Sequence, residues 1–280
     1  MAVAPNRHRR PGAAVGLIEE PTEAELDYCP FCAGREERTP PETFRVPGAG
    51  GWLVRVVPNL YPAFERQEVV VHSPRHIRTF AELTDPEVDA IAAAWYARRE
   101  AARAEGFPYV LALINEGRTA GSSLPHSHSQ LVWLRDRPPE VAREAAAGLV
   151  ELSAREDLAL GDGTVRAVVH PCGRTPYETV ILGEPFDLAA ALVVLRDVVR
   201  RLRAVEGAVP WNAWLHDDHL ELVPRLSVFG GVELGAGIYV NTVAPEDAAA
   251  ALRAVGPLMS GARRAAARGS DGQPRSQRRG

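Results

Sequence analysis

The sequence predicts an α+β fold made of two similar halves. Runs rich in β-branched and aromatic residues recur along the chain and predict strands. Stretches with apolar residues three and four positions apart separate these runs and predict amphipathic helices. The order strands, helix, strands, helix occurs twice, so we expect two α+β halves that meet near residues 136 to 160. With 280 residues, 46% of them hydrophobic, the chain has enough apolar residues for a buried core.

Eight segments have the composition of strands. Each is short, and most are bounded by charged or turn-forming residues, as strands of a globular domain are. They cover residues 52–57, 68–71, 109–114, 130–134, 165–169, 179–182, 220–223 and 237–241.

Four segments have the pattern of helices. The first begins behind Thr84, a candidate N-cap followed by Pro86, and carries an apolar stripe of Val88, Ile91, Ala92 and Trp95. The second carries a stripe from Leu188 to Leu202, the third covers residues 140–152, and the fourth begins near Pro245.

The segment between the two halves is rich in charged residues, Ala and Gly, and favours a helical connector. We therefore expect an N-terminal half over residues 1–136 and a C-terminal half over residues 137–262. Residues 263–280 contain six arginines with little apolar surface to bury, which predicts a disordered basic tail.

Composition excludes several classes of protein. The net charge of −4, with 36 acidic and 32 basic residues, argues against a chain that binds nucleic acid over its whole surface. No apolar run approaches the roughly 20 residues of a membrane span, and the first residues lack the apolar stretch of a secretory signal. Three cysteines do not make a disulfide framework. We expect a cytoplasmic protein that binds neither membrane nor nucleic acid.

The segment from Gly121 to Gln130 is the most informative part of the chain. In an extended strand His126, His128 and Gln130 project to one face about 7 Å apart. Such an alternation of polar side chains entering an apolar run is difficult to explain by packing. A neutral imidazole can attack phosphorus and form an activated phosphoramidate, while Gln130 and the hydroxyls of Ser122 and Ser123 can donate to phosphoryl oxygens. This segment predicts covalent chemistry on a phosphorylated substrate.

Cys29 and Cys32 form a CxxC pair in a turn-prone stretch. This spacing occurs both in metal knuckles and in redox-active thiol pairs. Because a redox pair is expected at the start of a helix behind a strand, we favour a tetrahedral zinc site, which requires two further ligands.

In this combination of motifs the sequence resembles the galactose-1-phosphate uridylyltransferase family of the histidine-triad superfamily. The matching segments occur in the family's order through most of the chain. They are Arg7-His8-Arg9-Arg10-Pro11, Cys29-Pro30-Phe31-Cys32, Val56 to Pro62, Val71 to His76, Asn115-Glu116-Gly117, Gly121 to Gln130, Pro176 to Thr179 and His219 to Leu226.

The resemblance implies two histidine-triad-like halves with an antiparallel sheet flanked by helices, and a homodimer. It makes His128 the nucleophile that becomes nucleotidylated and Gln130 its phosphate-orienting partner. The resemblance assigns the remaining site residues to two sets. The ligands of a structural zinc are Cys29, Cys32, His76 and His126, and the nucleotide and its phosphates are held by Asn59, Asn115, Ser122, Ser123, Arg7 and Arg10.

The resemblance favours a ping-pong transfer of UMP from a UDP-sugar to a hexose 1-phosphate, as in galactose metabolism. One alternative keeps His128 but uses ADP-glucose or a dinucleotide as donor in a phosphorylase or adenylyltransferase reaction. Another is a non-catalytic, zinc-stapled nucleotide-binding module. The chain departs from the family at Ser127, where Pro is common, and lacks an expected lysine in residues 228–240. His216 and His219 do not clearly reproduce the family's second metal cluster, so we predict no second metal.

Overall fold

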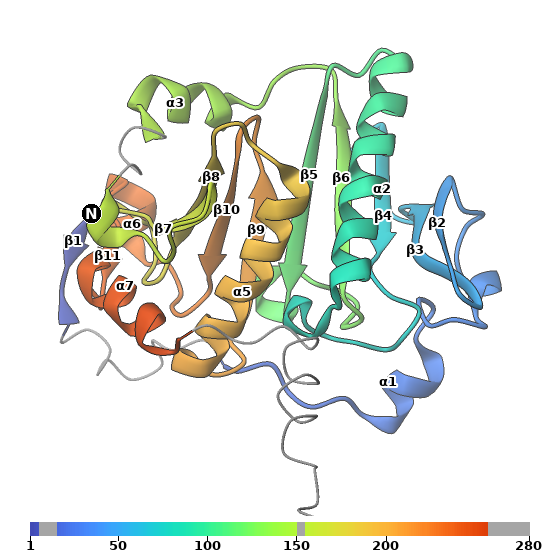
Figure 1. Cartoon of the computed structure of the whole chain (residues 1–280), viewed down its shortest axis with the longest axis horizontal. Helices are drawn as coiled ribbons and strands as arrows, with labels where there is room; N and C mark the ends of the chain where they lie inside the picture. Colours follow the sequence, from blue (N-terminus) through green and yellow to red (C-terminus); the bar gives the residue numbers. More distant parts are fainter. Residues whose placement is uncertain (6–15, 150–154, 257–280) are drawn as a thin grey trace, which may run out of the picture.

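The computed structural model describes residues 1–5, 16–149 and 155–256, and its centre is a nine-stranded sheet (Figure 1). All neighbouring strands of this sheet are antiparallel. Their spatial order is β2-β3-β4-β6-β5-β9-β10-β8-β7. The strands are β2 (Phe44–Gly48), β3 (Gly51–Pro58), β4 (Arg66–Val71), β5 (Tyr109–Glu116), β6 (His128–Leu134), β7 (Val165–Val169), β8 (Thr179–Gly183), β9 (Trp211–Leu215) and β10 (His219–Pro224).

Eight of the nine strands form two units with the same topology, and β2 is added at the edge of the first unit. In chain order the first is β3, β4, α2, β5, β6 and the second is β7, β8, α5, β9, β10. Their sheet orders, β3-β4-β6-β5 and β9-β10-β8-β7, are related by a half-turn about the pair Leu113 and Trp214, where β5 meets β9. Because Gln130 is paired with Leu113 and Glu221 with Trp214, these two residues occupy equivalent positions. His128 and His219, each the first residue of its strand, are equivalent as well.

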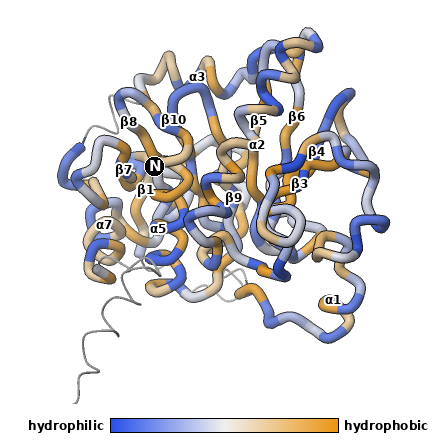
Figure 2. Tube along the Cα trace, turned by 45° about the vertical axis from the view of Figure 1, so that its right-hand side comes forward, coloured by the Kyte–Doolittle hydropathy of each residue, from blue (hydrophilic) through white to orange (hydrophobic). Residues whose placement is uncertain are grey.

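Two long helices cover one face of the sheet. Helix α2 (Asp85–Ala104) and helix α5 (Leu188–Glu206) contact each other and lie in front of the strands in Figure 1. Helix α2 begins behind the predicted N-cap Thr84, whose backbone N–H and hydroxyl both donate to the carboxylate of Glu87 in the first turn. Its predicted apolar stripe is buried, and so is that of α5. Hydrophobic residues follow β3, β4 and β6 through the interior (Figure 2).

The opposite face of the first unit carries a smaller cluster. Alternation along β6 turns Leu131 and Trp133 toward the helices, so His128 and Gln130 lie on the other face. There the side chains of Cys29, Phe31, Trp52, Val57, Val69 and Val71 pack together.

Shorter elements surround the sheet. Helix α1 (Glu23–Tyr28) lies beside the β2–β3 end, and α3 (Pro139–Ala147) lies above β8 in Figure 1. Strands β1 (Ala2–Val3) and β11 (Val240–Asn241) form a separate parallel pair. The other elements in the described part of the chain are α6 (Gly231–Ala236), α7 (Pro245–Ala254), and the 3-10 helices η2 (Glu36–Arg38), η3 (Phe80–Glu82), η4 (Arg118–Ala120) and η5 (Glu156–Leu158).

The structure corrects several predicted elements. The strand expected over residues 237–241 is wrong except for β11, because Gly237 ends α6 with a φ of 66°. The helix expected over residues 140–152 ends at Ala147 before Gly148, and residues 150–152 lie outside the described residues. Strands β2 and β9 were not predicted. The boundary at residues 136/137 stays a prediction, and the basic tail lies outside the described residues.

Among the helices that the structure describes, none is both long and apolar enough to cross a bilayer.

Candidate active site and metal cluster

His128 begins β6 and is buried, with 6% of its surface exposed. Its Nδ1 lies 2.7 Å from the carbonyl oxygen of His126. A carbonyl only accepts, so Nδ1 carries the proton and Nε2 keeps its lone pair. Burial lowers the pKa of His128, and the hydrogen bond to His126 opposes this only in part. The imidazole is therefore neutral near pH 7, which is the form that can act as a nucleophile.

His126 does not lie on the strand, because β6 begins at His128. Its ring turns away from the sheet toward Cys29, with Nδ1 3.4 Å from the Cys29 Sγ. The ring of Phe31 contacts both imidazoles edge-on, that of His126 at 5.9 Å and that of His128 at 5.5 Å between centroids. The predicted alternation thus holds for His128 and Gln130 and fails for His126.

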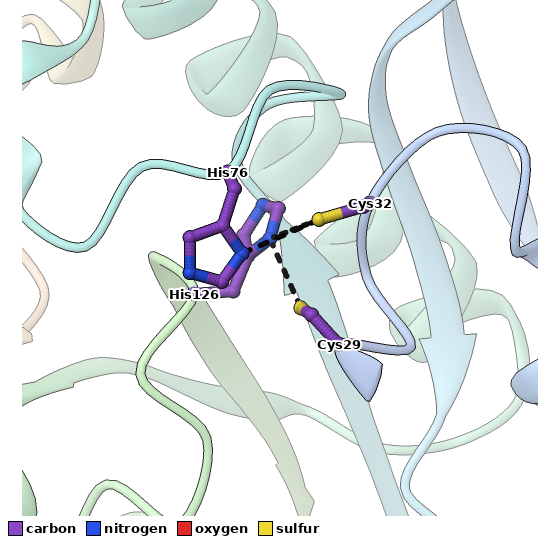
Figure 3. Close-up of side chains that lie close together, drawn as sticks. All are labelled: Cys29, Cys32, His76 and His126. Carbon is purple, nitrogen blue, oxygen red and sulfur yellow. Dashed lines mark hydrogen bonds between the residues drawn. The ribbon is translucent and has the colours of Figure 1, made fainter. Parts of the chain in front are cut away.

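Cys29, Cys32, His76 and His126 form one cluster (Figure 3), with their ligand atoms all within 4.8 Å of one another. The Cys32 Sγ lies 3.3 Å from the His76 Nδ1 and 3.7 Å from the His126 Nδ1. These separations match the edges, about 3.5 Å long, of a tetrahedron of two sulfur and two nitrogen ligands around one metal ion. Burial and then the neighbouring Cys29 raise the pKa of Cys32 to about 11, so two thiolates here require a cation between them. The cluster could hold a metal ion.

His76 and His126 each have a hydrogen-bond acceptor at Nε2, which orients the ring for metal binding through Nδ1. His76 Nε2 lies 2.9 Å from the Glu25 carboxylate, and His126 Nε2 lies 2.9 Å from the Ser73 carbonyl oxygen. Each acceptor holds a proton on Nε2 and leaves Nδ1 free to bind a metal. No sequence motif pointed to Glu25, which is one of several acidic residues ahead of the CxxC pair.

The loop between β5 and β6 carries both predicted serines. Gly117 has a φ of 89°, and a Cβ there would lie 2.8 Å from the Cβ of Pro210, so only glycine fits. Ser122 donates to the Leu124 carbonyl oxygen, while Ser123 is exposed. Both line a cavity of about 740 Å³ between this loop, α1 and the segment over residues 16–22, with Arg78 and Arg118 in its wall.

The two predicted asparagines have different partners. Asn59 follows β3 and accepts a hydrogen bond from the Tyr61 N–H. Asn115 lies on β5 and accepts one from the side chain of Asn212 on β9, which also donates to the Ala120 carbonyl oxygen. Neither residue belongs to the cavity wall described above. Arg7 and Arg10 lie outside the described residues.

A second cluster contains His219 and Glu221, the residues equivalent to His128 and Gln130 of the first unit. Glu144 of α3, His216, His219 and Glu221 have ligand atoms within 4.8 Å of one another and could also hold a metal ion. Burial alone lowers the pKa of His219, but its interactions with Glu144, Glu221 and Asp218 raise it to about 10. His219 thus supplies positive charge among carboxylates. The two histidines were visible in the sequence, whereas Glu144 comes from a helix 72 residues away from His216.

Comparison with known proteins identifies relatives of this chain. Residues 62–138 match the family described as galactose-1-phosphate uridyl transferase, N-terminal domain. An ADP-glucose phosphorylase of Arabidopsis thaliana is 27% identical over 90% of this chain and 88% of its own length.

Two solved structures from Arabidopsis thaliana share the fold. A crystal structure of an ADP-glucose phosphorylase with bound ADP-glucose superposes with a TM-score of 0.74 and 25% identity, covering 90% of this chain and 94% of that one. A GalT-like protein gives a TM-score of 0.72 and 27% identity, covering 80% and 91%. Together with the histidine-bearing strand and the repeated topology, these matches show that the chain has the fold of galactose-1-phosphate uridylyltransferase-like proteins and is similar in sequence to them.

Proposed function

We propose that this protein is a nucleotide-sugar phosphorylase that transfers AMP from ADP-glucose to inorganic phosphate through a covalent bond to His128. The observation that carries the proposal is the buried His128, whose Nδ1 proton is held by the His126 carbonyl. The choice of ADP-glucose follows the relative that is similar over most of both chains. The sequence motifs favoured a UDP-sugar donor, and the relatives support the alternative of an ADP-glucose donor better.

The proposed reaction has two displacements at one phosphorus. His128 Nε2 attacks the α-phosphorus of ADP-glucose, the bond to the bridging oxygen breaks, and glucose 1-phosphate leaves. The phosphoramidate so formed carries AMP on Nε2, and its Nδ1 proton stays directed at the His126 carbonyl. An oxygen of inorganic phosphate then attacks the same phosphorus, the P–N bond breaks, and ADP leaves with the imidazole neutral again.

The remaining predicted residues have binding roles in this proposal. Gln130 donates amide hydrogens to the oxygens of the attacked phosphoryl group, where negative charge develops in the transition state. Asn59, Asn115, Ser122 and Ser123 hold the nucleotide and its phosphates. Arg7 and Arg10 contribute positive charge, and a homodimer and a cytoplasmic location stay predictions.

We propose that the first cluster binds zinc. Two thiolates and two imidazoles at tetrahedral spacing are a donor set that zinc prefers. Its role is structural, because the peptide of His126 that orients His128 is then fixed at its side chain by the metal. Metal analysis of the purified protein should find zinc, and Cys29→Ser should lose the zinc of this cluster. Retention of all zinc by Cys29→Ser would contradict the assignment.

Trapping the covalent intermediate tests the function. The protein is incubated separately with ADP-glucose and UDP-glucose labelled with ³²P at the α-phosphorus, then denatured in alkali, in which a phosphoramidate survives. We expect acid-labile label from ADP-glucose, release of ADP on addition of phosphate, and no label in His128→Asn. The function is refuted by an unlabelled wild type or by equal labelling of His128→Asn.

Two other outcomes identify the competing hypotheses. Preferential labelling by UDP-glucose, discharged by galactose 1-phosphate, would establish UMP transfer, a reaction that the uridyl transferase match over residues 62–138 also permits. Tight nucleotide binding without label would indicate the non-catalytic module.

A further inference from the structure

Gln67 is a side chain that neither the motifs nor the proposed function uses, and it contacts Gln130 directly. It lies on β4, which pairs with β6 so that Val69 is opposite Gln130 and Gln67 is opposite Val132. Gln67 and Gln130 are therefore diagonal neighbours on the face that carries His128. Both are only partly buried, so a substrate on this face can reach them.

A directed series of hydrogen bonds passes through this pair. The backbone N–H of Ala63 donates to the Gln67 Oε1 over 2.9 Å. A backbone N–H can only donate, which fixes the oxygen end of the Gln67 amide. The other end, Nε2, lies 2.6 Å from the Gln130 Oε1 and donates to it. The Gln130 carbonyl is thereby occupied, and its NH2 group is the end left to face a ligand.

We propose that Gln67 is a positioning residue that sets the orientation of the Gln130 amide, so that the reacting phosphoryl group meets hydrogen-bond donors. The inference rests on the proposed function, in which Gln130 contacts that group. In the reverse orientation Gln130 presents its carbonyl oxygen to anionic phosphoryl oxygens, which repels them. Without Gln67 both orientations are populated, and only one of them stabilises the developing charge.

Gln67 also connects Gln130 to the loop over residues 59–64. Its backbone carbonyl accepts from the Asn59 N–H over 2.8 Å, in addition to the Ala63 contact of its side chain. This loop carries Asn59, which is proposed to hold the nucleotide, and the exposed side chains of Leu60 and Tyr61. A nucleotide that orders the loop thus also orders the Gln67 amide, and through it Gln130.

Replacing Gln67 by Glu is the sharpest test. Glutamate has the same length and still accepts from Ala63, but it cannot donate, so it draws the Gln130 NH2 group inward and turns the Gln130 carbonyl outward. We expect the single-turnover rate constant for nucleotidylation of His128 to fall about 10- to 100-fold. Gln67→Met removes the donor without adding charge, and we expect a smaller fall in the same rate. Melting temperature and metal content verify that each variant is folded.

A double-mutant cycle separates orientation from the added negative charge. In a Gln130→Ala background, Gln67→Glu should cause no further fall, because no amide remains to be turned. A further fall of similar size would show that charge repulsion is responsible and would overturn the inference. Glu65→Gln is the control in the same segment, since Glu65 is exposed and paired with Arg135, and it should leave the rate unchanged.

A readout that needs no turnover distinguishes this inference from the proposed function. In protein labelled with ¹⁵N at glutamine side chains, the Gln67 NH2 signal is the one lost in Gln67→Met. It should shift markedly in Gln130→Ala, because its acceptor is gone, whether or not any nucleotide sugar reacts. An unchanged Gln67 signal would refute the contact and the inference. If the Gln67 signal shifts in Gln130→Ala but neither nucleotide sugar labels the wild type, the contact between Gln67 and Gln130 is confirmed and the proposed function is refuted.

Discussion

Ser127 stands between the two motif histidines at a position where proline is common in the family that the sequence resembles. In the structure its N–H donates to the Ile77 carbonyl oxygen over 2.7 Å, a bond that proline cannot make. Its hydroxyl lies 3.0 Å from the Nδ1 of the fully buried His72. Both the backbone and the side chain of Ser127 therefore have hydrogen-bond partners within the fold.

We expect Ser127→Pro to lower the free energy of unfolding by about 2 to 4 kcal/mol, because it removes one backbone donor and leaves the buried His72 Nδ1 without a partner. Ser127→Ala keeps the backbone bond and should cost about 1 kcal/mol. Urea denaturation of the metal-loaded proteins measures both. Equal losses for the two variants would show that the backbone bond contributes nothing.

At the residue scale, sequence reasoning succeeded where a side chain's role depends on near neighbours. His128 and Gln130 share a face because strand alternation is a local rule. The ring direction of His126 could not be predicted from alternation, since it depends on cysteines 94 and 97 residues away. The contact between Gln67 and Gln130 requires the pairing of β4 with β6, which the sequence alone does not specify.

At the scale of elements, the strands dominated by β-branched, aromatic and other large apolar residues were predicted, and two strands in which other residues dilute that composition were not. Strand β9 contains Asn212 and Ala213, which dilute its strand signal, although its other residues pack well between β5 and β10. Strand β2 contains Pro47, which a strand at the edge of the sheet tolerates because one side needs no ladder hydrogen bonds. The position of each strand within the sheet decides both cases, and the propensities of its residues do not reveal that position.

The end of β5 carries an unusual carboxyl group. Glu116 is buried, accepts the Phe80 N–H over 2.7 Å, and has its pKa raised by burial to about 7. The folded protein therefore keeps this proton up to neutral pH, whereas the unfolded chain releases it near its ordinary value of 4.5. The free energy of unfolding should decrease as pH rises from about 5 to about 8, by up to about 3 kcal/mol from this group.

Glu116→Gln isolates this contribution. Below about pH 5 the variant and the wild type should be equally stable, and at pH 8 the variant should be more stable. Urea unfolding at several pH values, compared as the difference between the two proteins, cancels the titration of the metal ligands. A difference that does not change with pH would show that Glu116 ionises normally.

At the scale of the whole molecule, the second half supports the site of the first. The side chain of Asn212 crosses from β9 to the Asn115 side chain and to the Ala120 carbonyl oxygen, at 2.8 and 2.7 Å. One residue of the second half thus positions Asn115, which is proposed to bind the nucleotide, and also the loop that carries Ser122 and Ser123. The sequence pattern predicts two halves but no contact between them, because the pairing of β5 with β9 has no local signature.

We expect Asn212→Ala to weaken binding of ADP-glucose about 5- to 30-fold, since two hydrogen bonds of roughly 1 kcal/mol each no longer position the site. Calorimetry in a His128→Asn background measures binding without turnover. Asn241→Ala also removes a buried amide, one that donates to the Gly173 carbonyl oxygen in the second half. Asn241→Ala should lower the free energy of unfolding and leave binding of ADP-glucose unchanged. If both variants weaken binding equally, the proposed role of the Asn212 contacts with Asn115 and Ala120 is contradicted.

The half-turn that relates the two units has a consequence for a chain cut in two. Strand β5 is an interior strand only because β9 covers its edge, and a fragment that ends at residue 136 would expose that edge as a row of unpaired backbone groups. The partner of matching shape is another copy of the same fragment, its β5 running antiparallel about Leu113. Sedimentation of residues 1–136 should therefore find a self-paired dimer. Such a dimer would carry two copies of His128, the proposed nucleophile, whereas in the intact chain the position equivalent to His128 in the second unit is occupied by His219, which lies among carboxylates.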